Sequence, residues 1–147
     1  MTFIQKEVTT LIQKYRTNDP FLLAECLNIH VLFRFLHQQI NGFYKYEKRN
    51  KYIVINKSLS DQLQKFVCAH ELGHAVLHKD INTPFMRNYT FFSVDKIEVE
   101  ANTFAVELLM PNSSLYELQD TNLTIYEAAE LYGVPKEVCH LKEYNFF

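Results

Sequence analysis

The sequence predicts an α+β fold in which a small three-stranded β-sheet lies between helical segments. Two helical patterns come first, three short runs rich in β-branched and aromatic residues follow, and two longer helical patterns come after them. Of the 147 residues, 48% are hydrophobic and 22% are charged, proportions typical of a globular protein. We therefore expect a single domain over residues 1–147, with C-terminal helices over about 113–143 packed on it.

The N-terminal part is expected to supply two scaffold helices. Apolar residues recur at helical spacing over residues 3–15, so this segment is predicted to be an amphipathic helix. Asp19 is a good N-cap for a second helix, and Pro20 suits its first position because no hydrogen-bonded N–H is needed there. This second helix is expected to run to about Leu27.

Three segments are predicted to be β-strands: residues 30–36, 42–46 and 52–56. The first is rich in β-branched and aromatic residues, whereas the second alternates less cleanly between apolar and polar positions. The charged run 47–51 separates the last two segments and is most simply a solvated turn. We therefore expect these two strands to form a hairpin.

The most informative stretch is a His-Glu-x-x-His motif formed by His70, Glu71 and His74. On an α-helix, residues four apart stack on one face about 6 Å apart along the axis, so both imidazoles can bind one metal ion. Zinc accepts nitrogen and oxygen ligands in a tetrahedral arrangement, and Glu71 sits beside the pair, within reach of a water on the metal. The pattern therefore predicts the zinc helix of a hydrolase.

The apolar residues around the motif favour a helix with both histidines on its inward face. Ser58 is expected to cap this helix, with Asp61 three residues further on, and the helix is expected to end near residues 78–80. The alternative is a pair of core histidines bonded to backbone carbonyls, because buried polar rings need partners. The inward positions are Leu59, Leu63, Phe66, Val67, His70, His74 and Leu77.

A catalytic zinc site usually has three protein ligands and one open position, so the motif needs a third ligand. His78 lies eight residues after His70, about 12 Å along a straight helix, so we expect it to be a packing or outer-shell residue. The better candidate lies in the predicted helix 95–110, where Glu98 is at the margin of the apolar face and Glu100 on the polar side. We expect Glu98 to be the ligand and Glu100 to be solvated.

We also make predictions for two further residues of this helix, Asn102 and Glu107. Asn102 lies four residues after Glu98 on the same side, where it can orient a ligand histidine through the ring nitrogen that faces away from the metal. The equally favoured alternative is that the Asn102 amide lies on the surface. Glu107 is expected on the solvated polar side with Glu100, and Pro111 is expected to end the helix.

The two motif segments resemble the ImmA/IrrE family of zinc-dependent peptidases, which are encoded by bacteria and mobile elements. The matching residues are 66–78, which hold the histidine motif, and 98–111, which begin with the glutamate. The resemblance implies a zincin-like fold, with the sheet packed on the two motif helices. It also implies one Zn²⁺ ion held by His70, His74 and Glu98.

The same resemblance implies a zinc-dependent endopeptidase that cleaves a helix-turn-helix repressor of a phage or mobile element and so relieves repression. The metal would lower the pKa of a bound water toward about 7, and Glu71 would take its proton and pass it to the leaving amine. A strand edge beside the zinc helix is expected to hold the substrate main chain by strand addition. The sequence does not choose between the predicted strands.

Two other functions compete with this interpretation. The first is a non-catalytic, zinc-containing module that binds and sequesters a repressor, which a closed site with four protein ligands would favour. The second is DNA binding by residues 123–138, which read as a helix, a glycine turn and a helix. The net charge of −2 offers no basic excess for DNA, so packing or repressor docking is the favoured role of this segment.

The cysteines and the N-terminus predict a cytoplasmic location without a membrane partner. Cys26, Cys68 and Cys139 are odd in number and widely spaced, so we expect buried thiols in a reducing compartment rather than disulfides. The N-terminus does not read as a signal peptide, and no apolar run is long enough to span a bilayer.

The aromatic segment 81–93 joins the two motif helices. It is expected to be a loop that forms a lid or one wall of the cleft, or a surface loop pinned by its aromatic residues. Tyr89 within it is a candidate hydrogen-bond donor to the transition state.

Overall fold

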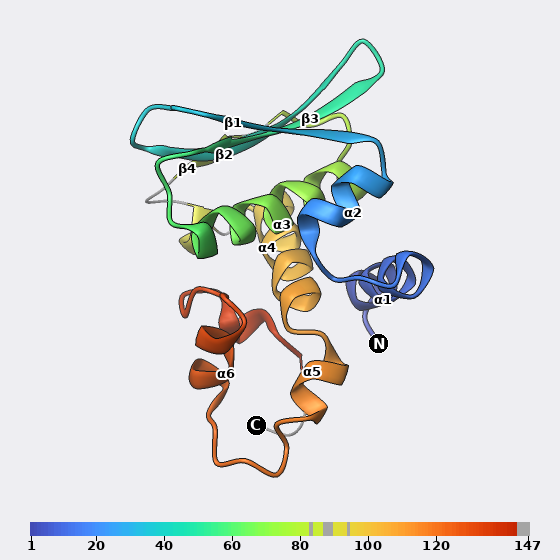
Figure 1. The fold of residues 1–147 in the computed structure, drawn as a ribbon, viewed down its shortest axis with the longest axis vertical. Helices are drawn as coiled ribbons and strands as arrows, with labels where there is room; N and C mark the ends of the chain where they lie inside the picture. The colour runs from blue at the N-terminus through green and yellow to red at the C-terminus, as the bar shows by residue number, and fades with distance from the viewer. Residues whose placement is uncertain (83, 87–89, 94, 144–147) are drawn as a thin grey trace.

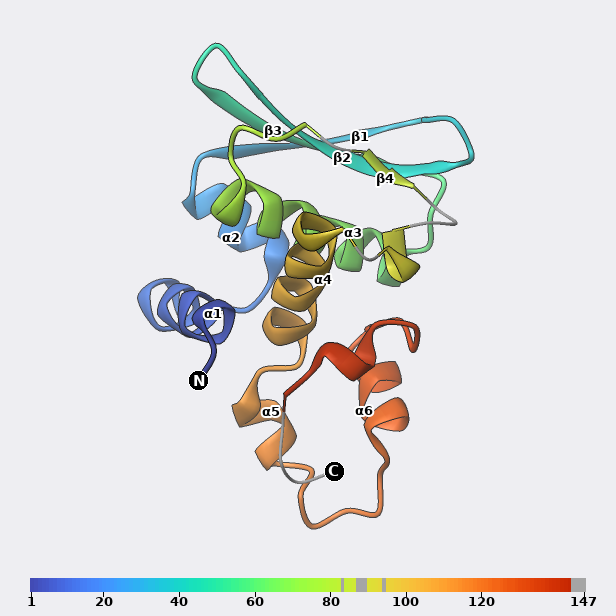
Figure 2. The same cartoon turned by 180° about the vertical axis from the view of Figure 1, so that it is seen from behind.

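The computed structural model describes residues 1–82, 84–86, 90–93 and 95–143. Within these ranges the chain combines six α-helices with one mixed sheet of four strands, which confirms the predicted α+β class. In Figures 1 and 2 the sheet lies across one end of the molecule, with helix α3 directly beneath it. Helix α4 crosses α3 on the side away from the sheet, and α5 and α6 lie at the opposite end of the molecule.

The two N-terminal helices follow the predicted positions. Helix α1 spans Phe3–Tyr15, and the Thr2 hydroxyl accepts a hydrogen bond from the Gln5 backbone N–H to cap it. Helix α2 spans Pro20–Cys26, and the Asp19 carboxylate accepts from the Phe21 N–H at 2.9 Å. Both predicted helices are therefore confirmed.

The sheet has the strand order β1-β3-β2-β4, with strands Ile29–Arg34, Ile40–Glu47, Asn50–Asn56 and Pro84–Met86 numbered along the chain. The hairpin prediction is confirmed, because β2 pairs antiparallel with β3. Strand β1 runs parallel to β3, and β4 pairs antiparallel with β2. The fourth strand corrects the three-stranded expectation, since three residues are too few to show a periodicity.

Helix α3 spans Asp61–Leu77, and its N-cap differs from the prediction. The Ser60 hydroxyl, not that of Ser58, accepts from the Leu63 N–H at 3.2 Å. Ser58 instead donates from its backbone N–H and its hydroxyl to the Asn56 side-chain oxygen. The Ser58 side chain is used in this local turn after β3, so the N-cap lies two residues later than predicted.

Helix α4 spans Lys96–Leu109, and its expected polar side is not solvated at Glu107. Glu107 is 4% exposed and pairs with the Lys142 ammonium at 2.6 Å, while Gln5 donates a second hydrogen bond to it. The expectation was wrong because α1 and the C-terminal segment cover this side of α4. Burial lowers the pKa of Lys142, and the Glu107 carboxylate opposes that shift.

Replacing Lys142 with Met should lower the free energy of unfolding by about 3 kcal/mol, because the Glu107 carboxylate would stay buried without its cation. Urea unfolding of the purified protein measures this difference. Lys65→Met, at an exposed position of α3, is the matched control and should change stability little. Equal stability of the two variants would contradict the structural role of the pair.

The C-terminal segment differs from the expected helix, glycine turn and helix. Helices α5 (Asn112–Tyr116) and α6 (Ile125–Leu131) form, and Gly133 takes a positive φ of 74°. Within the described residues after Gly133, only the short 3-10 helix η2 (Cys139–Leu141) follows, since Pro135 cannot donate a backbone hydrogen bond. Across the described residues, no helix is both long and apolar enough to cross a membrane.

The cysteines are free thiols, but only two of them are buried. Burial is the main cause that raises the pKa of both Cys68 and Cys139, so these thiols stay protonated. Cys26 is exposed at the end of α2, which corrects the expectation that all three would be buried.

Candidate metal centre

A glycine allows the two motif helices to approach closely. A Cβ built on Gly73 would lie 3.1 Å from the Phe104 Cβ and 3.2 Å from the Ala101 carbonyl oxygen. Gly73 lies between the two motif histidines, so this contact between α3 and α4 is next to them. The close crossing brings the Glu98 carboxylate of α4 to the histidine face of α3.

Gly73→Val should lower the free energy of unfolding by about 2 kcal/mol, because the added methyl groups must push α4 away from α3. The same displacement should weaken any metal binding that depends on Glu98. Urea unfolding and a zinc titration measure the two effects. Lys65→Val, on an exposed position of the same helix, is the control, and an equal result for both variants would contradict the packing argument.

Four side chains converge where the helices cross: His70, Glu71, His74 and Glu98, here called the central cluster. The Glu98 oxygens lie 3.3 Å from the His70 Nε2 and 2.9 Å from the His74 Nε2. The nearer Glu71 oxygen lies 3.8 Å from the His70 Nε2. His70 and Glu71 are 0% exposed, His74 1% and Glu98 5%, so the whole cluster is removed from solvent.

The inward-facing atoms of the central cluster contact one another but have no hydrogen-bond partner outside the cluster within the described part of the chain. They are both histidine Nε2 atoms and both oxygens of each glutamate. Buried polar atoms are normally hydrogen-bonded or coordinate a metal. Two ligand atoms of a tetrahedral zinc ion lie about 3.3 Å apart, which matches the Glu98–His70 separation, and the 2.9 Å Glu98–His74 separation would lengthen slightly around an ion.

The same geometry disfavours a pair of structural core histidines. The outward Nδ1 atoms of both rings contact side chains rather than backbone carbonyls, at Asn102 and His78 respectively. The inward Nε2 atoms face the Glu98 carboxylate, at 3.3 and 2.9 Å, rather than a backbone carbonyl. Two imidazoles buried around one carboxylate suit a shared cation better than a pair of isolated core histidines.

The two carboxyl groups of the cluster have opposite pKa shifts. Burial and the charge of Glu98 raise the pKa of Glu71 well above its usual range. Burial also tends to raise the pKa of Glu98, but contacts with His70 and His74 outweigh it and bring the value to about 2. Such a divergence typically separates a fixed anion from a group that exchanges a proton.

Asn102 is 2% exposed, so it is not a surface amide. Its side-chain oxygen lies 2.8 Å from the His70 Nδ1, on the side of the ring away from the central cluster. Its amide nitrogen donates to the Thr90 carbonyl oxygen at 3.0 Å. This second bond fixes the amide orientation, so the oxygen faces the histidine.

His78 lies outside the central cluster, next to His74. Its Nδ1 is 3.1 Å from the His74 Nδ1, and its Nε2 is 3.0 Å from a Glu100 oxygen. The Glu100 side chain is 32% exposed, so Glu100 is partly solvated and also contacts His78. The contact between His74 and His78 could have been predicted from their spacing of four residues, which places them on one helix face.

The segment between the motif helices supplies a wall of the site. Phe85 of β4 is fully buried, and its ring centroid lies 4.5 Å from that of His70. Phe91 packs edge-on against Phe85 at 5.2 Å. These contacts agree with the wall alternative for the described part of residues 81–93, whereas Tyr89 lies outside the described residues.

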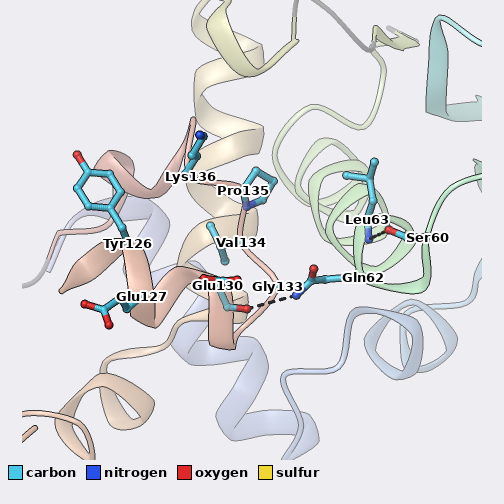
Figure 3. Close-up of a pocket in the computed structure, with 10 residues that line it drawn as sticks. All are labelled: Ser60, Gln62, Leu63, Tyr126, Glu127, Glu130, Gly133, Val134, Pro135 and Lys136. Carbon is cyan, nitrogen blue, oxygen red and sulfur yellow. Dashed lines mark hydrogen bonds between the residues drawn. The ribbon is translucent and has the colours of Figure 1, made fainter. Parts of the chain in front are cut away.

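A separate pocket of about 420 Å³ lies between the N-terminal end of α3 and the segment around α6 (Figure 3). The Gln62 side chain crosses to donate a hydrogen bond to the Glu130 carbonyl oxygen. The lining contains no histidine or cysteine, and none of the central cluster. This pocket therefore contains none of the candidate metal ligands.

An α+β fold in which a His-Glu-x-x-His helix crosses a glutamate-bearing helix is typical of zincin-like metallopeptidases. The chain belongs to the ImmA/IrrE family, since residues 24–142 match the Peptidase_M78 family, described as the IrrE N-terminal-like domain. It is 54% identical over 142 residues to immunity region protein 2 of Bacillus phage phi105, covering 97% of this chain and 90% of that protein. It is 34% identical over 114 residues to Metallopeptidase ImmA of Bacillus subtilis strain 168, covering 78% and 67% respectively.

Proposed function

We propose that this chain is a zinc-dependent endopeptidase that cleaves a helix-turn-helix repressor of a phage or mobile element in the cytoplasm. The observation that supports this best is the central cluster, whose buried polar atoms have no partner outside the cluster among the described residues and converge at separations close to those around one ion. The immunity-region name of the phage relative and the metallopeptidase name of the bacterial relative support this choice.

In this proposal His70, His74 and Glu98 hold one zinc ion. Their three ligand atoms come from two helices whose crossing is fixed by packing, so little ordering is needed on binding. When bound, zinc supplies a Lewis acid that lowers the pKa of water toward about 7 and polarises a carbonyl. Glu98 supplies the anionic ligand, in agreement with its pKa of about 2.

Glu71 is the proposed general base. It is beside the histidines but farther from the His70 Nε2 than Glu98 is, at 3.8 Å rather than 3.3 Å. Its raised pKa suits a group that takes a proton from water, holds it, and then passes it to the leaving amine.

The substrate main chain is proposed to pair with strand β4. The strand order leaves β1 and β4 at the two edges of the sheet, and only an edge strand has unpaired backbone groups. Of these two, β4 is beside the central cluster, because its Phe85 ring contacts His70. An extended peptide added along β4 would pass next to the proposed base.

The direct test is incubation of the purified, zinc-loaded protein with the helix-turn-helix repressor encoded beside its gene. Mass spectrometry should find two repressor fragments with one new peptide terminus, and a chelator added beforehand should prevent their formation. A stable complex without cleavage would instead support the sequestering module. In that case Glu71 would be tested as a fourth ligand, since a closed site is structural.

A further inference from the structure

We propose that His78 and Glu100 are a positioning pair that fixes the His74 ring in the tautomer needed for metal binding. The inference rests on the proposed metal site, because it assigns what lies behind one of the ligands. His78 is the C-cap residue of α3, and Glu100 lies near the N-terminal end of α4. His78 is 9% exposed at its side chain and Glu100 is 32% exposed, so the relay leads from the buried cluster toward the surface.

The geometry admits only two arrangements of protons for neutral rings. The His74 and His78 Nδ1 atoms are 3.1 Å apart, so one of them must donate a hydrogen bond and the other must accept it. If His74 donates, its Nε2 has a lone pair that faces the central cluster. If His78 donates, the His74 proton is on Nε2, where it blocks binding to an ion.

Glu100 selects between these arrangements. A carboxylate only accepts hydrogen bonds, and the Glu100 oxygen lies 3.0 Å from the His78 Nε2. The His78 proton is therefore favoured on Nε2, which leaves its Nδ1 as an acceptor for His74. The chain of hydrogen bonds then runs from the His74 Nδ1–H to His78, and from the His78 Nε2–H to Glu100.

The other motif histidine has an equivalent arrangement on its own outward side. The Asn102 amide is fixed by its bond to the Thr90 carbonyl, so its oxygen accepts from the His70 Nδ1–H. Both Nε2 atoms then face the Glu98 carboxylate, at 3.3 and 2.9 Å, which is the side on which an ion would bind. Two different outer groups thus give the same tautomer to the two rings.

Zinc affinity, measured by competition with a chromogenic chelator, tests the pair without depending on peptidase activity. Glu100→Leu and His78→Leu should each weaken zinc binding about 10-fold or more. Glu100→Gln keeps an acceptor oxygen and should bind zinc close to wild type, which separates hydrogen bonding from charge. His140→Leu, at an exposed histidine of η2, is the matched control.

The tautomers can also be read in the zinc-loaded protein, from ring ¹⁵N chemical shifts. We expect the proton on Nδ1 in His74 and on Nε2 in His78. A wild-type His78 protonated on Nδ1, or unchanged zinc affinity in both leucine variants, would overturn the inference. A wild type that binds no zinc would instead count against the proposed function on which the pair rests.

Discussion

Replacing Glu71 with Gln should lower kcat/KM for repressor cleavage by about 10³-fold while leaving zinc content at the wild-type value. The substitution keeps the size of the side chain but removes its ability to take a proton. The ligand atoms proposed for the metal belong to other residues, so the ion should remain bound. Cleavage rates from fragment formation and zinc per chain from mass spectrometry measure the two parts.

The control for this variant is Glu117→Gln, at an exposed position just after α5, which should cleave at the wild-type rate. Cleavage by Glu71→Gln at a rate close to wild type would remove the general-base role. Loss of zinc from Glu71→Gln would show instead that Glu71 is a ligand. That result would move the site toward the closed, structural alternative.

Replacing Glu98 with Gln should weaken zinc binding by more than about 100-fold, because a neutral amide oxygen would replace the proposed anionic ligand. Cleavage at limiting zinc should fall in proportion to occupancy. The matched variant is Glu100→Gln, two residues along the same helix, which should retain zinc. The measurement is the same chelator competition for both proteins.

The reverse order of affinities would assign the ligand to Glu100 and would contradict the geometry. Equal, weak binding by both variants would suggest that α4 had moved rather than that a ligand was lost. Urea unfolding of both variants distinguishes these cases, since a displaced helix costs packing energy whereas a lost ligand in the metal-free protein does not.

The parts of the fold that could be predicted are those with a long, regular pattern. The apolar spacing of α3 and α4 was enough to place His70 and His74 on an inward face and Glu98 at the margin of a buried one. The helix caps at Asp19 and Pro20 were equally local and were confirmed. In these segments, residues within one turn of each other determine the structure.

The parts that could not be predicted depend on contacts between distant segments. The sequence alone predicts a solvated Glu107, because Lys142 and Gln5, which cover it in the structure, are far away in sequence. Strand β4 exists because β2 provides an edge for it, and its own three residues carry no signal. The His78 contact with Glu100 likewise depends on how α4 crosses α3.

The buried cluster of His70, His74 and Glu98 is proposed to hold one metal ion. The most direct measurement is zinc per chain, by mass spectrometry, in wild type and in a His70→Ala, His74→Ala double variant after both are exposed to excess zinc and dialysed. The geometry predicts one zinc ion per wild-type chain and none in the double variant. A wild-type chain without zinc, or equal zinc in both proteins, would contradict the metal site and the peptidase mechanism built on it.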